Sequence, residues 1–115
     1  MNKELEKLLF NPVRLKILSF LFSVENASFK KLMEVSEATK GNISVQIKKL
    51  EDAGLIKVRK KFEGNYPLTL CKITSKGKTS FKIFLNSLQS FWITRYKGIM
   101  KKTLIKNLGL ILEIR

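Results

Sequence analysis

The residues best suited to contact a ligand lie in one stretch, TKGNISVQIKKLEDAGL, at residues 39–55. Its polar positions carry amide, hydroxyl and ammonium groups, and carboxylates come only near its end, at Glu51 and Asp52. Amide, hydroxyl and lysine groups hydrogen-bond the edges of DNA bases, valine can touch the methyl group of thymine, and lysine neutralises phosphates. The side chains expected to contact DNA from this stretch are Lys40, Asn42, Ser44, Val45, Gln46, Lys48 and Lys49.

A second cluster of basic residues follows it and precedes the turn-forming sequence EGNYP at 63–67. Lysine and arginine at the end of a β-hairpin can lie along phosphates or enter a narrow minor groove. The alternative is that these lysines only protect a sheet edge from pairing with other chains. We favour DNA contact because the charges gather at the loop end of the hairpin. The residues expected to contact DNA here are Arg59, Lys60, Lys61 and Asn65.

The composition favours a polyanionic partner, either nucleic acid or an anionic membrane. The chain has 23 Lys and Arg against 9 Asp and Glu, a net charge of +14. A proteome that is basic throughout is the alternative source of this charge. The chain has no histidine and one cysteine, Cys71, so we expect no metal site, no cofactor and no catalysis by a nucleophile with a histidine base. With neither paired acids nor a phosphate-binding glycine loop, an enzyme is not expected.

The lone cysteine is expected to be a small buried residue of a strand. Lysines across the hairpin, at 57–61, could lower the pKa of Cys71, and this leaves a role in redox sensing open.

Periodicity predicts the elements that must position these residues. Helices are expected over 3–10, 12–23, 29–36 and 40–53, a hairpin with a loop of about five residues over 55–73, and a long helix from Ser75. Asn11, Ser28 and Thr39 are expected as N-caps, and Gly54 as the residue that ends the helix at 40–53. This order predicts a mostly α fold with a β-hairpin wing (α+β). The predicted fold is a winged helix-turn-helix at 1–77, followed by an expected C-terminal dimerisation helix and tail at 78–115.

The long helix carries a stripe of aromatic and aliphatic residues that exceeds what a small domain can cover, so we expect it to pair with a second copy. Packing within the chain is the alternative, above all for Phe81 and Phe84. A two-fold dimer would read a pseudo-palindromic operator with half-sites about 34 Å apart, or a multiple of this. The residues assigned to the dimer interface are Phe84, Leu88, Phe91, Trp92 and Ile99.

Three segments carry a resemblance to a known family: NPVRLKILSFL at 11–21, TKGNISVQIKKLEDAGLIKVRK at 39–60 and ITSKGKTSF at 73–81. Over residues 8–92 the chain resembles the small winged-helix transcriptional regulators of archaea and bacteria related to the MarR and ArsR repressors. The resemblance implies a dimeric, sequence-specific DNA-binding protein. Its recognition-helix contacts carry over as positions to Lys40, Asn42, Ser44, Val45 and Lys48. Relatives often have histidine where Gln46 stands, and the Cys and His clusters of metal-sensing members are missing here.

Two other functions stay open. The winged helix could dock on an acidic protein surface without reading DNA. The tail at 95–115 could form a basic amphipathic helix on anionic lipid, although we favour the dimer over a membrane partner. A small-molecule effector is compatible with the fold, but no residue set indicates one. No signal peptide or run of about 20 apolar residues is present, so a cytoplasmic location is expected.

Overall fold

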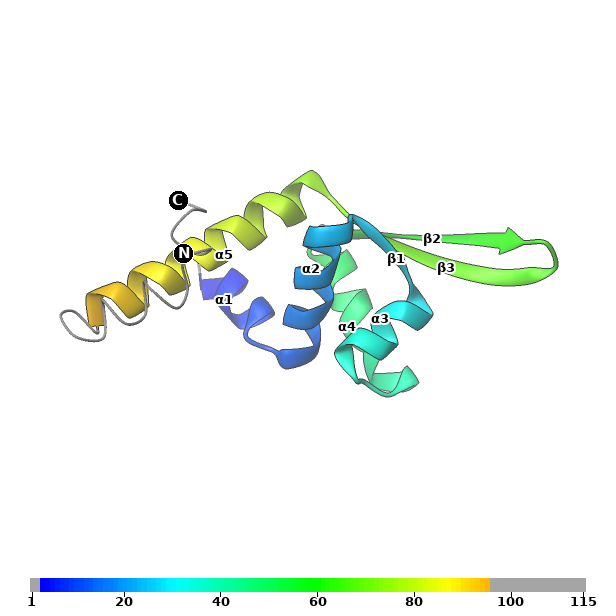
Figure 1. Cartoon of the computed structure of the whole chain (residues 1–115), viewed down its shortest axis with the longest axis horizontal. Coiled ribbons are helices and arrows are strands. Elements are labelled where there is room, and N and C mark those ends of the chain that lie inside the picture. The colour runs from blue at the N-terminus through cyan, green and yellow to red at the C-terminus, as the bar shows by residue number, and fades with distance from the viewer. Residues whose placement is uncertain (1–2, 96–115) are drawn as a thin grey trace.

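The computed structural model describes residues 3–95, with side chains for residues 3–90. The molecule measures 58 × 26 × 25 Å, and a β-hairpin and the last helix project from opposite ends of a group of four helices (Figure 1). The elements in chain order are α1 (Lys3–Leu9), α2 (Pro12–Val24), β1 (Asn26–Ser28), α3 (Phe29–Ser36), α4 (Lys40–Asp52), β2 (Ile56–Glu63), β3 (Tyr66–Ile73) and α5 (Ser75–Arg95).

Helices α2, α3 and α4 begin where the sequence predicts. The side-chain oxygens of Asn11, Ser28 and Thr39 each accept a hydrogen bond from a backbone N–H in the first turn, at 2.9, 3.0 and 3.2 Å. Helix α4 is followed by Gly54, whose φ of +80° suits glycine. These boundaries are set by neighbours in the sequence, which is why the sequence predicts them correctly.

The sheet has three antiparallel strands in the order β1-β3-β2, one more than predicted. Strand β1 is only three residues long and pairs with β3, so that Ala27 lies opposite Cys71. Such a short strand has no measurable period in the sequence, and its pairing depends on residues far along the chain.

The wing, which we define as β2, β3 and the turn between them, has a tighter loop than predicted. Glu63 pairs with Tyr66, so the loop is the two residues Gly64 and Asn65 rather than about five. Gly64 has a φ of +64°, a conformation that two-residue hairpin turns often require. Strand β2 pairs with β3 on one side alone and is therefore an edge of the sheet.

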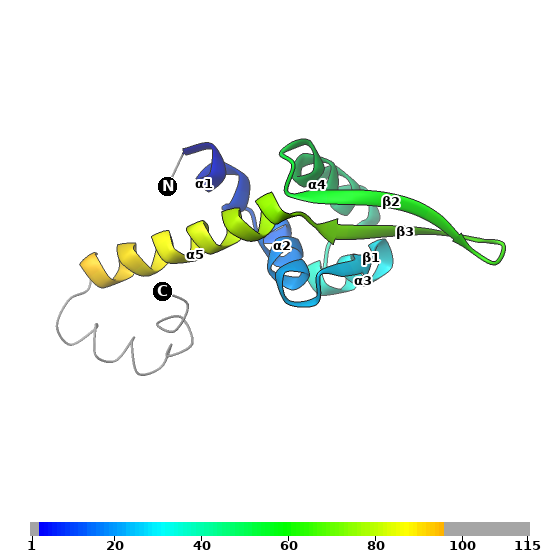
Figure 2. The same cartoon turned by 90° about the horizontal axis from the view of Figure 1, so that it is seen from above.

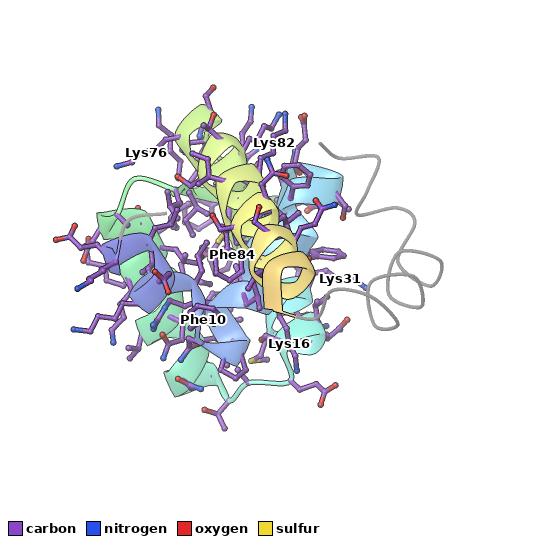
Figure 3. All side chains as sticks on the ribbon, turned by 90° about the vertical axis from the view of Figure 1, so that its left-hand side faces the viewer. Phe10, Lys16, Lys31, Lys76, Lys82 and Phe84 are labelled. Atoms are coloured by element: carbon purple, nitrogen blue, oxygen red, sulfur yellow. The ribbon has the colours of Figure 1, made fainter. Side chains whose placement is uncertain are left out.

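One hydrophobic core joins the helices to the base of the sheet and includes the first half of α5. The rings of Phe22 and Phe81 lie 5.0 Å apart, and those of Phe10 and Phe84 lie 5.2 Å apart at 68°. Figure 3, viewed along α5, shows Phe84 beneath that helix towards Phe10, with the labelled lysines around the outside. Phe84 is fully buried in its own chain, so its assignment to a dimer interface is wrong and the alternative of intrachain packing holds.

The wing is fastened to α5 at Thr74 and Gly77. The hydroxyl of Thr74 donates to the carbonyl of Gly54 (2.7 Å) and accepts from the N–H of Gly77 (2.9 Å). A Cβ atom on Gly77 would lie 2.1 Å from the carbonyl oxygen of Leu55, so a larger residue cannot enter without moving the backbone. This contact holds the end of α4, the start of β2 and the start of α5 together.

Candidate nucleic-acid interface

Helices α3 and α4 form a helix-turn-helix. They are joined by the three residues 37–39, and Glu37 adopts a left-handed φ of 57°. The inner side of α4 is anchored by Ile43, Ile47 and Leu50, all buried. Figure 2 shows that α4 lies beside β2, with β1 and α3 on the other side of β3. The second helix of the motif therefore has one face in the core and the other in solvent next to the wing.

We call the solvent side of the first ten residues of α4 its outer face. It carries three lysines and no carboxylate, and nothing lies within 4 Å of the place where Gly41 would carry a Cβ atom. Val45 is 51% exposed. Six of the seven predicted contact residues of this helix are exposed with Gly41 on this face: Lys40, Asn42, Ser44, Val45, Lys48 and Lys49.

Gln46 is the exception, and its predicted place on the DNA-facing side is corrected by the structure. Its side chain is 8% exposed. Its amide oxygen accepts a hydrogen bond from Nη1 of Arg14, and its Nε2 donates to Oδ1 of Asn42 at 2.9 Å. Arg14 comes from α2, 32 positions earlier. The sequence offers no signal for this pairing, because its two members lie on different helices.

The polar groups of the outer face are not equally free. Lys48 forms an ion pair with Asp52 at 2.8 Å and a longer one with Glu51 at 3.9 Å. The hydrogen bond and charge of Asp52 raise the pKa of Lys48. The Ser44 hydroxyl donates to the carbonyl of Lys40 at 2.9 Å, so towards a ligand it is an acceptor.

The charged residues of the wing lie where the sequence predicts them. Arg59, Lys60 and Lys61 are exposed on the edge strand β2, and Asn65 is exposed in the turn. The structure adds two aromatic residues that the sequence analysis did not select, Phe62 at 76% exposure and Tyr66 at 79%. Their position beside the turn could have indicated this exposure, because aromatic residues at the end of a hairpin have few neighbours to bury them.

Cys71 has the environment of a structural cysteine. It lies on the central strand opposite Ala27 and Val58 and is fully buried. Burial, followed by the negative charge of Glu51, raises the pKa of Cys71 to about 11. The suggestion that nearby lysines lower this pKa is therefore wrong, and the thiol is held in its unreactive form at neutral pH.

Between residues 3 and 95, no three or more His, Cys, Asp or Glu side chains gather so as to hold a metal ion, and no helix is both long and apolar enough to cross a membrane. A groove of about 560 Å³ runs between α1, the end of α4 and α5, with Leu5, Leu8 and Ile83 among its walls. The polar residues Glu4, Asp52, Lys76 and Ser80 also line this groove, and their mixed charges do not specify one class of ligand. A small-molecule effector therefore stays untested.

The remaining predicted interface residues lie near or beyond the end of the description. Leu88 is half-buried against the core. Phe91 and Trp92 belong to α5, but their side chains lie outside the described residues. Ile99 and the basic tail proposed for lipid binding also lie outside them.

Comparison with known proteins agrees with this geometry. Residues 13–92 match the family model of the winged helix DNA-binding domain. An uncharacterised protein of Methanocaldococcus jannaschii is 35% identical over 79 residues, which cover 69% of this chain and 86% of that protein.

Solved structures show the same fold. A transcriptional regulator homologue from Pyrococcus horikoshii OT3 is 38% identical and superimposes with a TM-score of 0.70 over 77% of this chain and 90% of its own. The crystal structure of MarR, at 18% identity, has a TM-score of 0.70 over 96% of this chain and 82% of its own, and shows a shared fold alone. The predicted winged-helix resemblance is confirmed: the chain belongs to the winged helix DNA-binding domain family.

Proposed function

We propose that the protein is a homodimeric transcriptional regulator that reads a pseudo-palindromic operator in double-stranded DNA. Helix α4 would enter the major groove, and the wing would contact the adjacent backbone or minor groove. The observation that carries this proposal is the outer face of α4, which is basic, free of carboxylates and exposed while the opposite side is anchored in the core. No enzymatic activity forms part of it.

Within this proposal the residues of the outer face have different roles. Asn42, Ser44 and Val45 are suited to base edges, since they combine short polar groups with one apolar contact. Lys40, Lys48 and Lys49 are suited to phosphates, and the positive end of the α4 dipole adds to the attraction at Lys40.

The wing would add a second contact. Arg59, Lys60 and Lys61 supply the charge, and Phe62 and Tyr66 supply exposed apolar area at the tip. Proteins that bind the minor groove combine these two features, because basic groups follow the phosphates while apolar side chains press on sugars or base steps.

A dimer is proposed through the second half of α5. This helix has 21 residues, a length of about 31 Å at 1.5 Å per residue. Among the side chains of α5 that the structure describes, up to residue 90, the last fully buried one is Phe84, and Figure 1 shows the helix running on past α1 and α2. The aromatic pair Phe91 and Trp92 follows in that extension, where a second copy is the economical partner.

Titration of a randomised duplex pool at several salt concentrations tests DNA binding. We expect log K to fall with the logarithm of the salt concentration by about 0.9 for each neutralised phosphate. Flat dependence, or no binding at low salt, would reject the proposal and favour a protein or lipid partner for the basic surface.

Substitutions on the outer face test which surface is used. We expect Asn42→Ala and Lys48→Ala each to weaken specific binding about tenfold, while the oligomeric state stays unchanged. Lys82→Ala is the matched control, because it removes the same charge from an exposed position of α5. Equal losses for Lys48→Ala and Lys82→Ala would point to non-specific charge rather than a recognition helix.

A further inference from the structure

Arg14 is the one charged side chain among the buried residues of the described chain, at 9% exposure. Its Nε donates to the carbonyl of Leu8 at 2.6 Å and its Nη2 to that of Lys7 at 3.4 Å. Its third partner is the amide oxygen of Gln46. None of the ion pairs formed by the described residues includes Arg14.

The guanidinium is held by oxygen atoms that carry no full charge. Two of them are carbonyls in the last turn of α1, where the helix dipole is negative and favours a cation. Burial lowers the pKa of Arg14, but a guanidinium keeps its proton in proteins. The site therefore contains a permanent donor with no ability to accept a hydrogen bond.

This property orders the two amides that follow. Gln46 must present its oxygen to Arg14, because arginine only donates. Its Nε2 is then left to donate, and it does so to Oδ1 of Asn42 at 2.9 Å. Asn42, an exposed residue, thus has its oxygen engaged by Gln46, and its Nδ2 group is left to donate to a ligand.

We propose that Arg14, acting through Gln46, fixes the amide of Asn42 so that the outer face of α4 offers donors at this position. The inference rests on the proposed function. Asn42 would then read an acceptor on a base edge, such as N7 or O6 of guanine or O4 of thymine. Adenine is less favoured than guanine, since bidentate pairing with adenine would need Oδ1 of Asn42 to accept a second hydrogen bond while it accepts from Gln46. Arg14 and Gln46 are positioning residues that touch no DNA.

Gln46→Glu tests this directly. A carboxylate still accepts from Arg14 and gives the buried cation a counterion, so we expect the fold to be retained. It can only accept from Asn42, whose Nδ2 must then turn inwards and leave Oδ1 facing outwards. The variant should prefer an amino group at that base, N4 of cytosine or N6 of adenine.

The measurement is selection from a randomised duplex library with the full-length chain, followed by competition binding. At one base position in each half-site we expect the preference of Gln46→Glu to be inverted by about tenfold, with other positions unchanged. Asn42→Ala should lose preference at the same position. The matched control Lys49→Ala, on the same exposed flank but outside the hydrogen-bond chain, should weaken all duplexes alike.

A second variant covers failure of Gln46→Glu to fold, which thermal unfolding would reveal. Asn42→Asp, at an exposed position, still accepts from Gln46 but has no outward donor, so it should move the preference the same way. Two outcomes would overturn the inference alone. The folded variants could keep the base preference of the wild type, or they could lose affinity uniformly without a change at one base position. Absence of duplex binding by the wild type would overturn the proposed function and the inference with it.

Discussion

At the scale of single residues, the outer face of α4 is partly neutralised by its own helix. Lys48 is engaged by Asp52, whereas Lys40 and Lys49 take part in none of the ion pairs among residues 3–90. An exposed pair of this kind stabilises the fold little, because water and salt screen it. Its main effect would be on binding, since the carboxylate competes with phosphate for the ammonium group.

Asp52→Asn should therefore tighten DNA binding about two- to fivefold at moderate salt, because Lys48 is released and a negative charge is removed. Salt-dependent titration with one duplex would measure it. Glu25→Gln is the control, since it breaks the 2.8 Å pair with Lys78 on α5 and makes the same charge change away from α4. Similar gains for both variants would mean that net charge alone matters.

Titration of Cys71 makes the free energy of unfolding depend on pH in the alkaline range. The pKa of the folded thiol, about 11, lies above its ordinary value of 9.0, so the folded state holds its proton longer than the unfolded state. The free energy of unfolding is therefore unaffected by titration of this thiol below pH 9.0. It falls as the pH rises towards 11, by up to about 2 kcal/mol. Urea unfolding of the wild type and Cys71→Ala between pH 8 and 11 would show a steeper decline for the wild type. Parallel curves would contradict it.

At the scale of elements, two glycines show how one residue type serves opposite purposes. Gly41 opens α4 where its outer face has free space, while Gly77 lies in the first turn of α5 against the backbone at Leu55. The space at Gly41 is of use to an approaching ligand, and the space at Gly77 is already filled by the chain itself.

Alanine at each glycine should separate these roles. Gly41→Ala should raise the free energy of unfolding by about 0.5 kcal/mol through helix propensity, yet weaken DNA binding because the added methyl group holds the groove away. Gly77→Ala should lower the free energy of unfolding by about 2 kcal/mol or more, since the new Cβ meets a carbonyl oxygen. Chemical denaturation and duplex titration of both variants provide the comparison. Unchanged binding by Gly41→Ala would argue against close approach at this turn.

At the scale of the whole molecule, the two proposed DNA contacts and the proposed dimer contact lie apart. Helix α4 packs against β2, and the wing projects from that end, while α5 leaves from the other (Figure 1). A dimer formed along α5 would leave both copies of the outer face exposed. This separation allows DNA binding and assembly to be changed independently.

The dimer can be followed with the natural chain, because Trp92 is its single tryptophan. Sedimentation should give twice the 13.3 kDa chain mass, and dilution should shift tryptophan emission to longer wavelength as the interface opens. Phe91→Asp should shift the equilibrium to monomer, whereas Ser90→Asp, at an exposed neighbouring position, should not. A monomer at concentrations that bind an operator would reject the dimer.

The sequence by itself determined the features that depend on near neighbours. Capping residues and apolar periods placed α2, α3 and α4, and the spacing of Ile43, Ile47 and Leu50 divided α4 into a buried side and an exposed one. The basic wing followed from alternation beside a turn. Each signal acts within a few residues, so it can be read along the chain.

The tertiary structure alone decided what depends on distant residues. Gln46 turns inwards because it accepts a hydrogen bond from Arg14 on another helix. Phe84 is buried against Phe10, and strand β1 forms only through its pairing with β3. The raised pKa of Cys71 likewise comes from the burial of the central strand within the folded chain. These outcomes are set by which surfaces meet when the chain folds, and neither residue type nor local spacing contains that information.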